Sequence, residues 1–402
     1  MVGLSLFLAL VIGLVVWLTR QDSTYHAPLD HQPPQSGQVD TDAVAGLLAR
    51  LQSAVRRHDA AAAQRLGSSA TSQGLLRSVV DNARALRVSD FSLRFVDQDG
   101  AVGADGSFAA DVDTTWRFAG FDRTAEHLEI RIGVADRQGR LLVDRIGGGG
   151  HRTPLWLSGP LQVRRTATSM VLVDGSAAEA SRLAGLAERA VPQVRRVLPG
   201  WAGGLVVEAP RSQHGLEVAL GAHRGSYDGI AAVTTTPDGS RSRRSPSHVF
   251  VNPQVFGPLR PQGAQVVITH EATHVATDAA MSTAPIWLVE GFADYVALSA
   301  QQLPVSTTAA RIIALVRHNG LPRHLPDARE FAAGAPHLEA RYESAWLACR
   351  LLAQTGGQSA LVAFYRAVDA GSALGPALHR HFGLTVSGFV GRWRALLAQV
   401  AR

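Results

Sequence analysis

The first part of the chain has two hydrophobic periods in succession. Apolar residues three to four positions apart predict helices over residues 41–58 and 59–88, because such residues share one helix face. The first stripe consists of Val44, Leu47, Leu48, Leu51 and Val55. The period then falls to two, which predicts strands at residues 91–96, 108–118, 127–134 and 141–146. Helices followed by antiparallel strands predict a small α+β domain over residues 41–163.

The second part of the chain places strands before helices. Short apolar runs predict buried strands at residues 170–173, 204–208, 230–235 and 248–252. We expect one helix over residues 177–197, after the first of these strands, and another over about residues 263–280, after the last. From there to the C-terminus the pattern is helical or loop. This order predicts a second domain over residues 164–402 with a helical C-terminal lobe.

Four consecutive glycines at residues 147–150 mark a flexible break before the second domain. The length of 402 residues agrees with two or three domains. The helix-then-strand order of residues 41–163 resembles the cystatin-like or nuclear-transport-factor-2-like cone, in which helices pack on a curved sheet. We expect this domain to be a binding module or a structural spacer, because nothing in its sequence marks a catalytic group.

The N-terminus begins with an apolar run. Residues 2–18 carry no charge, and about 17 residues is the lower limit for a helix that crosses a bilayer. No basic start or small-residue cleavage site accompanies the run, so we favour an uncleaved transmembrane anchor over residues 1–20 to a signal peptide. The proline-containing residues 21–40 are predicted to be a linker. We therefore expect a single-pass membrane protein whose domains lie outside the cytoplasm.

Composition and charge narrow the range of partners. The chain is 46% hydrophobic and 18% charged, as expected for a globular protein. Its net charge is +6, but the arginines are scattered and no aromatic-rich basic motif is present, so nucleic acid is not an expected partner. The single cysteine, Cys349, excludes an intrachain disulfide and is expected to be a buried thiol.

The most specific candidate chemistry lies in residues 266–274. His270 and His274 are four residues apart, so on a helix both imidazoles lie on one face and can reach a single metal ion. Glu271 follows the first histidine and is placed to act as general base toward a water activated by that metal. No proline or glycine interrupts residues 265–280, so the segment can form one helix.

A second segment, residues 287–295, offers carboxylates for the same site. Catalytic zinc takes three protein ligands and keeps one position open. Glu290 is the best third ligand, because it lies on a predicted helix that begins after Pro285 and can pack beside the first. Asp294 lies one turn after Glu290 and can accept the remaining ring N–H of His270. A surface position or a helix cap remains the alternative for Asp294.

These two segments, His270-Glu271-x-x-His274 and Glu290-Gly291-x-x-Asp294, together resemble the gluzincin zinc metallopeptidases. The closest group is the peptidase-MA-like one, which is related to the zinc aminopeptidases. The resemblance implies a thermolysin-like fold, in which a mixed sheet precedes the motif helix and its edge strand lines the cleft. We expect residues 248–252 to form that edge strand.

The same resemblance implies a tyrosine that stabilises the oxyanion. Tyr342, at the start of residues 342–351, matches that segment and could donate to the developing negative oxygen. An ordinary aromatic residue at a helix start is the alternative. The Gly-x-Met-x-Asn signature of the aminopeptidases is not present, which argues against aminopeptidase activity.

Taken together, these residues predict a membrane-anchored zinc metallopeptidase whose Zn²⁺ ligands are His270, His274 and Glu290. We expect it to hydrolyse peptide bonds in a peptide or protein, with Glu271 as general base. The alternative is a non-catalytic binding or scaffold protein that keeps the zinc fold at the cell surface, and the intact Glu271 argues against it. An intramembrane protease is disfavoured, because only residues 2–18 are long and apolar enough to cross a bilayer.

Overall fold

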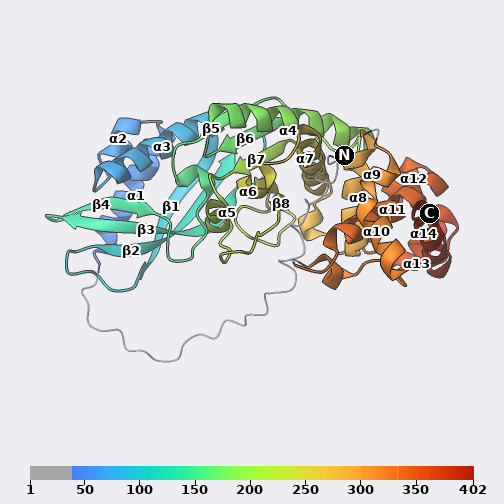
Figure 1. Ribbon diagram of the computed structural model, residues 1–402. Helices are drawn as coiled ribbons and strands as arrows, with labels where there is room; N and C mark the ends of the chain where they lie inside the picture. The colour runs from blue at the N-terminus through green and yellow to red at the C-terminus, as the bar shows by residue number, and fades with distance from the viewer. Residues whose placement is uncertain (1–38, 302, 333) are drawn as a thin grey trace.

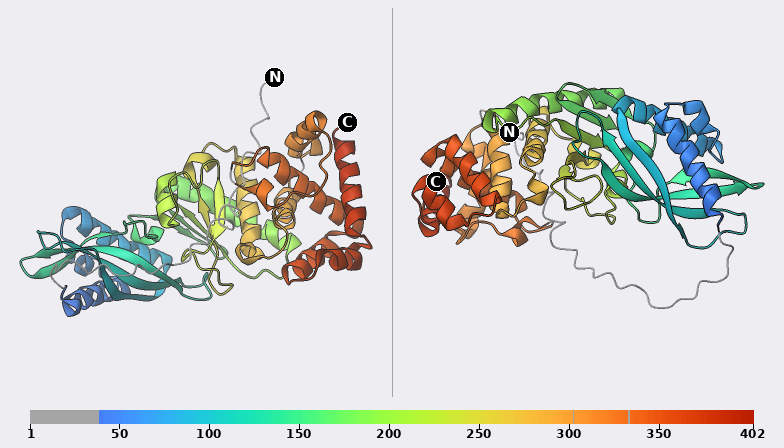
Figure 2. Two further views of the ribbon diagram at one scale, coloured as in Figure 1. Left: turned by 90° about the horizontal axis from the view of Figure 1, so that it is seen from below. Right: turned by 180° about the vertical axis from the view of Figure 1, so that it is seen from behind.

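A computed structural model describes residues 39–301, 303–332 and 334–402. The described chain is elongated, with the first sheet at one end, a second sheet in the middle and a helical lobe at the other end (Figures 1 and 2). The fold is α+β, as predicted, because each sheet is accompanied by helices that cover it.

The first unit packs three helices on an antiparallel sheet. Its helices are α1 (Thr41–Arg56), α2 (Ala60–Gln64) and α3 (Ala70–Leu86). Its strands are β1 (Val88–Asp99), β2 (Phe108–Phe118), β3 (Glu126–Arg137) and β4 (Arg140–Ile146), paired in that order. Side-chain oxygens of Asp40 and Ser69 accept backbone N–H groups at the starts of α1 and α3, which fixes where these helices begin. The apolar stripe of α1 is buried between α3 and the sheet.

The core of this unit continues into the second sheet. Trp116 and Trp156 are fully buried in it, and Met170, Leu172 and Val206 from the second sheet pack in the same apolar cluster. The two units therefore share a packed interface. The second sheet starts at β5 (Gln162–Arg165), so the boundary predicted between residues 163 and 164 falls inside a strand.

The second sheet is mixed and has the order β5-β6-β7-β9-β8. Its other strands are β6 (Ser169–Val173), β7 (Leu205–Ala209), β8 (Ala232–Thr235) and β9 (His248–Val251). The three central strands β6, β7 and β9 run parallel, while β5 and β8 are antiparallel to their neighbours. Helix α4 (Ala177–Val197) follows β6 and packs against the sheet and the motif helix (Figure 1).

The prediction that residues 248–252 form the edge strand is wrong. Residues 248–251 form β9, which lies between β7 and β8, and β8 is the edge strand instead. The reason is that β8 and β9 form an antiparallel pair joined by the loop of residues 236–247, so β9 uses its other side to pair with β7. Among the strands that the structure describes, β8 pairs only with β9.

The helical lobe begins with the motif helix α7 (Pro261–Ala276) and with α8 (Ile286–Ser299), which packs on it. The remaining helices of four residues or more are α5 (Gln213–Ala219), α6 (Pro253–Phe256), α9 (Val305–Thr308), α10 (Ala310–Asn319), η3 (Ala328–Phe331), α11 (Leu338–Gly356), α12 (Gln358–Asp369), α13 (Leu374–Phe382) and α14 (Val386–Val400). Helix α11 packs along α8, so α8 lies between α7 and α11. This packing holds α7 and α8, which carry the candidate ligands, in a fixed position relative to each other.

The predicted transmembrane helix requires correction. None of the helices within residues 39–301, 303–332 and 334–402 is both long and apolar enough to cross a membrane. Helix α4 has 21 residues but carries charges such as Glu188 and Arg195, while the apolar α8 has only 14 residues. Residues 1–20, where the anchor was predicted, and most of the predicted linker lie outside the described residues. The predictions of a transmembrane anchor and of a single-pass membrane protein thus find no support among the described residues.

Candidate metal centre

Helix α7 presents His270 and His274 on one face. Their rings lie 4.5 Å apart between centroids, and both side chains are buried. This follows from the four-residue spacing, which places the second imidazole one turn above the first. The helix begins with Pro261 at its first position, where the missing N–H costs nothing.

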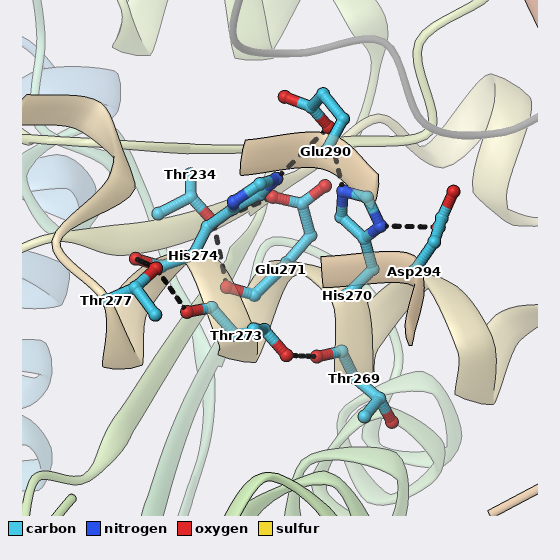
Figure 3. A network of polar contacts seen from close by, with 9 residues as sticks. All are labelled: Thr234, Thr269, His270, Glu271, Thr273, His274, Thr277, Glu290 and Asp294. Atoms are coloured by element: carbon cyan, nitrogen blue, oxygen red, sulfur yellow. Dashed lines mark hydrogen bonds and ion pairs between the residues drawn. The ribbon is translucent and has the colours of Figure 1, made fainter. Parts of the chain in front are cut away.

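Helix α8 brings Glu290 to the same point. Its Oε2 atom lies 3.2 Å from Nε2 of His270 and 3.4 Å from Nε2 of His274 (Figure 3). One ligand atom from each of the three residues lies within 4.8 Å of the others, so this buried group could hold a metal ion. The structure thus brings together the three residues that the sequence identified as ligands.

The polar atoms of the site fit a bound cation. Glu290 Oε1 and His274 Nδ1 are buried and have no hydrogen-bond partner within the part of the chain that the structure describes. A single carboxylate oxygen faces two imidazole nitrogens, an arrangement that a shared metal ion satisfies directly. Buried polar groups without partners are costly unless a ligand completes them.

Asp294 orients the first histidine. Its Oδ1 lies 2.8 Å from Nδ1 of His270, so it accepts that N–H and leaves Nε2 directed at Glu290 (Figure 3). Burial alone would lower the pKa of His270, but the negative charges of Asp294 and Glu290 outweigh burial and raise it to about 10. The position predicted for Asp294 is thus the one that it occupies.

Electrostatics also keep Glu290 ionised. Burial opposes the charged form of this carboxyl, but the positive charge of His274 and the hydrogen bonds from both imidazoles lower its pKa to about 2. The ionised carboxylate is the form in which Glu290 can act as a metal ligand, and each histidine would release its Nε2 proton when a metal binds.

Glu271 lies beside the ligands and is held by the edge strand. Thr234, on β8, donates its hydroxyl to Glu271 Oε2 at 2.7 Å, and the same hydroxyl lies 3.2 Å from the Glu271 carbonyl oxygen. Glu271 Oε1 is buried and has no hydrogen-bond partner among the described residues. One carboxylate oxygen is therefore fixed and the other is free to interact with a ligand. Sequence reasoning missed Thr234, since a threonine in a short apolar run carries no local signal.

Tyr342 approaches the site from α11. Its ring centroid is 6.4 Å from that of His270 and 5.0 Å from that of Phe331, and the residue is buried. The hydroxyl has no hydrogen-bond partner in the described residues. Burial raises the pKa of this phenol well above its ordinary value, and the charge of Glu290 adds to the effect. The hydroxyl therefore keeps its proton and can act as a donor.

A second group of possible ligands lies in the first unit. Asp99, Asp111 and His151 also have ligand atoms within 4.8 Å of one another. These side chains are partly exposed, and Asp99 already forms an ion pair with Arg131 at 2.6 Å. The group around His270 differs in being fully buried and in having two imidazole Nε2 atoms close to one carboxylate oxygen of Glu290.

No protein-family model matches the chain, and the search of characterised proteins found no significant match. The resemblance to gluzincins consequently rests on the residues of the two segments and on their arrangement in α7 and α8.

Proposed function

We propose that this protein is a zinc-dependent metallopeptidase. The observation that carries the proposal is the buried group of His270, His274 and Glu290 with Glu271 beside it. One carboxylate oxygen of Glu271 accepts a hydrogen bond from Thr234, and the other has no partner among the described residues. Two imidazoles and one carboxylate form the ligand set of a catalytic zinc site that keeps a position open for substrate or water.

The donor chemistry favours zinc over the hard cations. Calcium and magnesium prefer sites made of oxygen ligands, whereas imidazole nitrogen suits zinc and its neighbours in the first transition row. A zinc ion held by these residues would act as a Lewis acid that polarises a carbonyl and lowers the pKa of a water to about 7.

Each nearby residue has a definite part in this proposal. Glu271 would take a proton from the attacking water on its free Oε1 and deliver it to the leaving amine. Tyr342 would donate its hydroxyl to the oxygen that becomes negative as the carbonyl is attacked. Asp294 would hold His270 in the tautomer that a ligand needs.

The edge of β8 that pairs with no other described strand supports a peptide as substrate. Asn252 donates its N–H to the Ala231 carbonyl at 2.8 Å, so residues 231 and 252 form a hydrogen-bonded pair. Pairs of the two types alternate along an antiparallel ladder, so the backbone groups of Ala232 and Thr234 point away from β9, toward the unpaired edge of β8. An extended peptide could pair with these groups beside Glu271.

Zinc analysis and peptide hydrolysis test the proposal together. The purified protein should contain stoichiometric zinc and cleave an unstructured protein such as casein, and a chelator should stop cleavage. Glu271→Gln should retain zinc but lose about 10²-fold or more in turnover, because the general base is gone while the ligands remain. Cleavage by Glu271→Gln at the wild-type rate would contradict the proposal, and zinc binding without hydrolysis by the wild type would favour a non-catalytic binding role.

A further inference from the structure

An apolar cavity of about 630 Å³ lies between the edge strand and the helical lobe. Its apolar walls include Val233, Trp287, Val289, Leu325, Leu374 and Val386. Cavities of this size and character are typical of sites that bind small molecules or parts of larger ligands.

The cavity adjoins the metal centre. Val289, which lines it, immediately precedes Glu290 on α8. Thr234, which also lines it, donates a hydrogen bond to Glu271 at 2.7 Å. A chain bound next to Glu271 along β8 would therefore have the cavity within reach of its side chains.

The cavity wall includes apolar surface that the fold leaves in water. Val386 is 41% exposed, and within the described ranges Val96, in the first unit, is the only other exposed large hydrophobic residue. Removing such surface from water is favourable, so an apolar group that covered Val386 would be bound preferentially.

The charged residues around the cavity also favour an apolar occupant. The charged side chains that line the cavity are Arg152 and Asp327, together with the titratable His324. Both are already engaged: Arg152 donates to the Pro237 carbonyl at 3.4 Å, and Asp327 accepts the Arg329 N–H at 2.9 Å at the start of η3. A charged side chain that entered the apolar part would lose hydration without gaining a partner there.

We propose that this cavity binds an apolar side chain of the peptide substrate and makes the enzyme selective for peptides with such a residue near the scissile bond. The inference rests on the proposed function, because it names the substrate class of the same site. The occupant is an extended peptide segment paired with β8, whose alternate side chains point into the cavity.

Binding to the inactive Glu271→Gln protein tests this selectivity without relying on turnover. The probes are fluorescent blocked hexapeptides of glycine and serine that carry a single Leu or a single Asp at each position in turn. We expect the best Leu peptide to bind at least about tenfold more tightly than its Asp counterpart, as for discrimination by an apolar pocket. Adding Val386→Asp should remove most of this difference.

Val96→Asp is the matched control, since Val96 is 43% exposed and Val386 is 41% exposed. It should leave the preference for Leu unchanged. Val386 is the first residue of α14, where an acidic side chain suits the helix N-terminus, so Val386→Asp should fold. Val386→Ala provides a milder variant, with an intermediate loss of the preference for Leu.

The outcomes separate the two proposals. Equal binding of Leu and Asp peptides would overturn the cavity assignment, as would equal effects of Val386→Asp and Val96→Asp. If the wild type does not hydrolyse peptides but Glu271→Gln binds Leu peptides in a manner sensitive to Val386→Asp, the cavity assignment stands and the peptidase proposal fails. Hydrolysis with no preference for apolar residues at any position would leave the peptidase proposal standing and overturn the cavity assignment.

Discussion

Thr234 connects the edge strand to the candidate general base. Its hydroxyl donates to Glu271 Oε2 and thereby leaves Oε1 without a partner among the described residues. A carboxylate held at one oxygen loses less rotamer freedom when it acts, and its free oxygen keeps a fixed direction. Thr234 does not contact the candidate ligands in any hydrogen bond that the structure describes, so its contribution can be separated from metal binding.

Replacing Thr234 by valine should lower kcat by about 10–100-fold, because valine keeps the shape of threonine but cannot hold Glu271. KM and zinc content should change little, which enzyme kinetics and metal analysis can measure. Thr234→Ser retains the hydroxyl and should restore most of the activity. Equal impairment of Thr234→Val and Thr234→Ser would show that the hydrogen bond is not responsible, because serine keeps the hydroxyl that valine lacks.

The grouping of the candidate ligands could be predicted from sequence, and the contact between Thr234 and Glu271 could not. His270 and His274 are related by one helical turn, and Asp294 follows Glu290 by another, so local periodicity alone places each pair on one face. Thr234 reaches Glu271 because β8 lies at the sheet edge next to α7. That arrangement depends on strand pairing over long sequence distances, which a local pattern does not encode.

At the scale of elements, the apolar patterns located the motif helix and its neighbour well. The expected helix over residues 263–280 is α7 (Pro261–Ala276), and the helix expected after Pro285 begins at Ile286. The strand order was less predictable. Residues 230–235 and 248–252 have similar apolar runs, and only their pairing with β7 decides which of them is the edge.

Gly291 sets the distance between α8 and α11. A Cβ atom there would lie 2.3 Å from the Ala345 carbonyl oxygen, which is too close for any side chain. Gly291→Ala should therefore push α8 outward and lower the free energy of unfolding by about 1–3 kcal/mol. Because Glu290 is the adjacent residue, zinc affinity should fall as well. Denaturant unfolding and chelator competition measure the two effects.

Gly391, on α14, supplies the control for that substitution. A Cβ atom at this position has no heavy atom within 4 Å among the described residues outside its own helical neighbourhood. Gly391→Ala should be neutral or stabilising by up to about 1 kcal/mol, since alanine favours the helix. Similar destabilisation by both substitutions would show that close packing of α8 on α11 is not the cause.

At the scale of the whole molecule, a buried histidine joins the two sheets. His248, on β9, places Nδ1 2.7 Å from Glu208 of β7 and Nε2 3.1 Å from Asp122 of the first unit. Phe118, also from the first unit, stacks on the imidazole ring with centroids 5.6 Å apart. Both ring nitrogens face carboxylates, so the arrangement favours the doubly protonated imidazolium.

This contact should make the stability of the molecule depend on alkaline pH. Burial opposes the charged form of His248, but Asp122 and Glu208 outweigh it and raise the pKa from 6.5 to about 10, while burial raises the pKa of nearby Glu126 to about 9. A raised histidine pKa stabilises the fold fully below about pH 6.5, and this contribution disappears as the pH rises through 10. The raised pKa of Glu126 acts in the same direction.

Denaturant unfolding between pH 6 and 10 should show this decline in stability, and His248→Asn should flatten it. The substitution should also lower the free energy of unfolding by about 3–5 kcal/mol at pH 6, because two buried carboxylates lose their cation. The same replacement at the exposed His214 should leave the curve unchanged, and parallel curves for the wild type and His248→Asn would rule out His248 as the source.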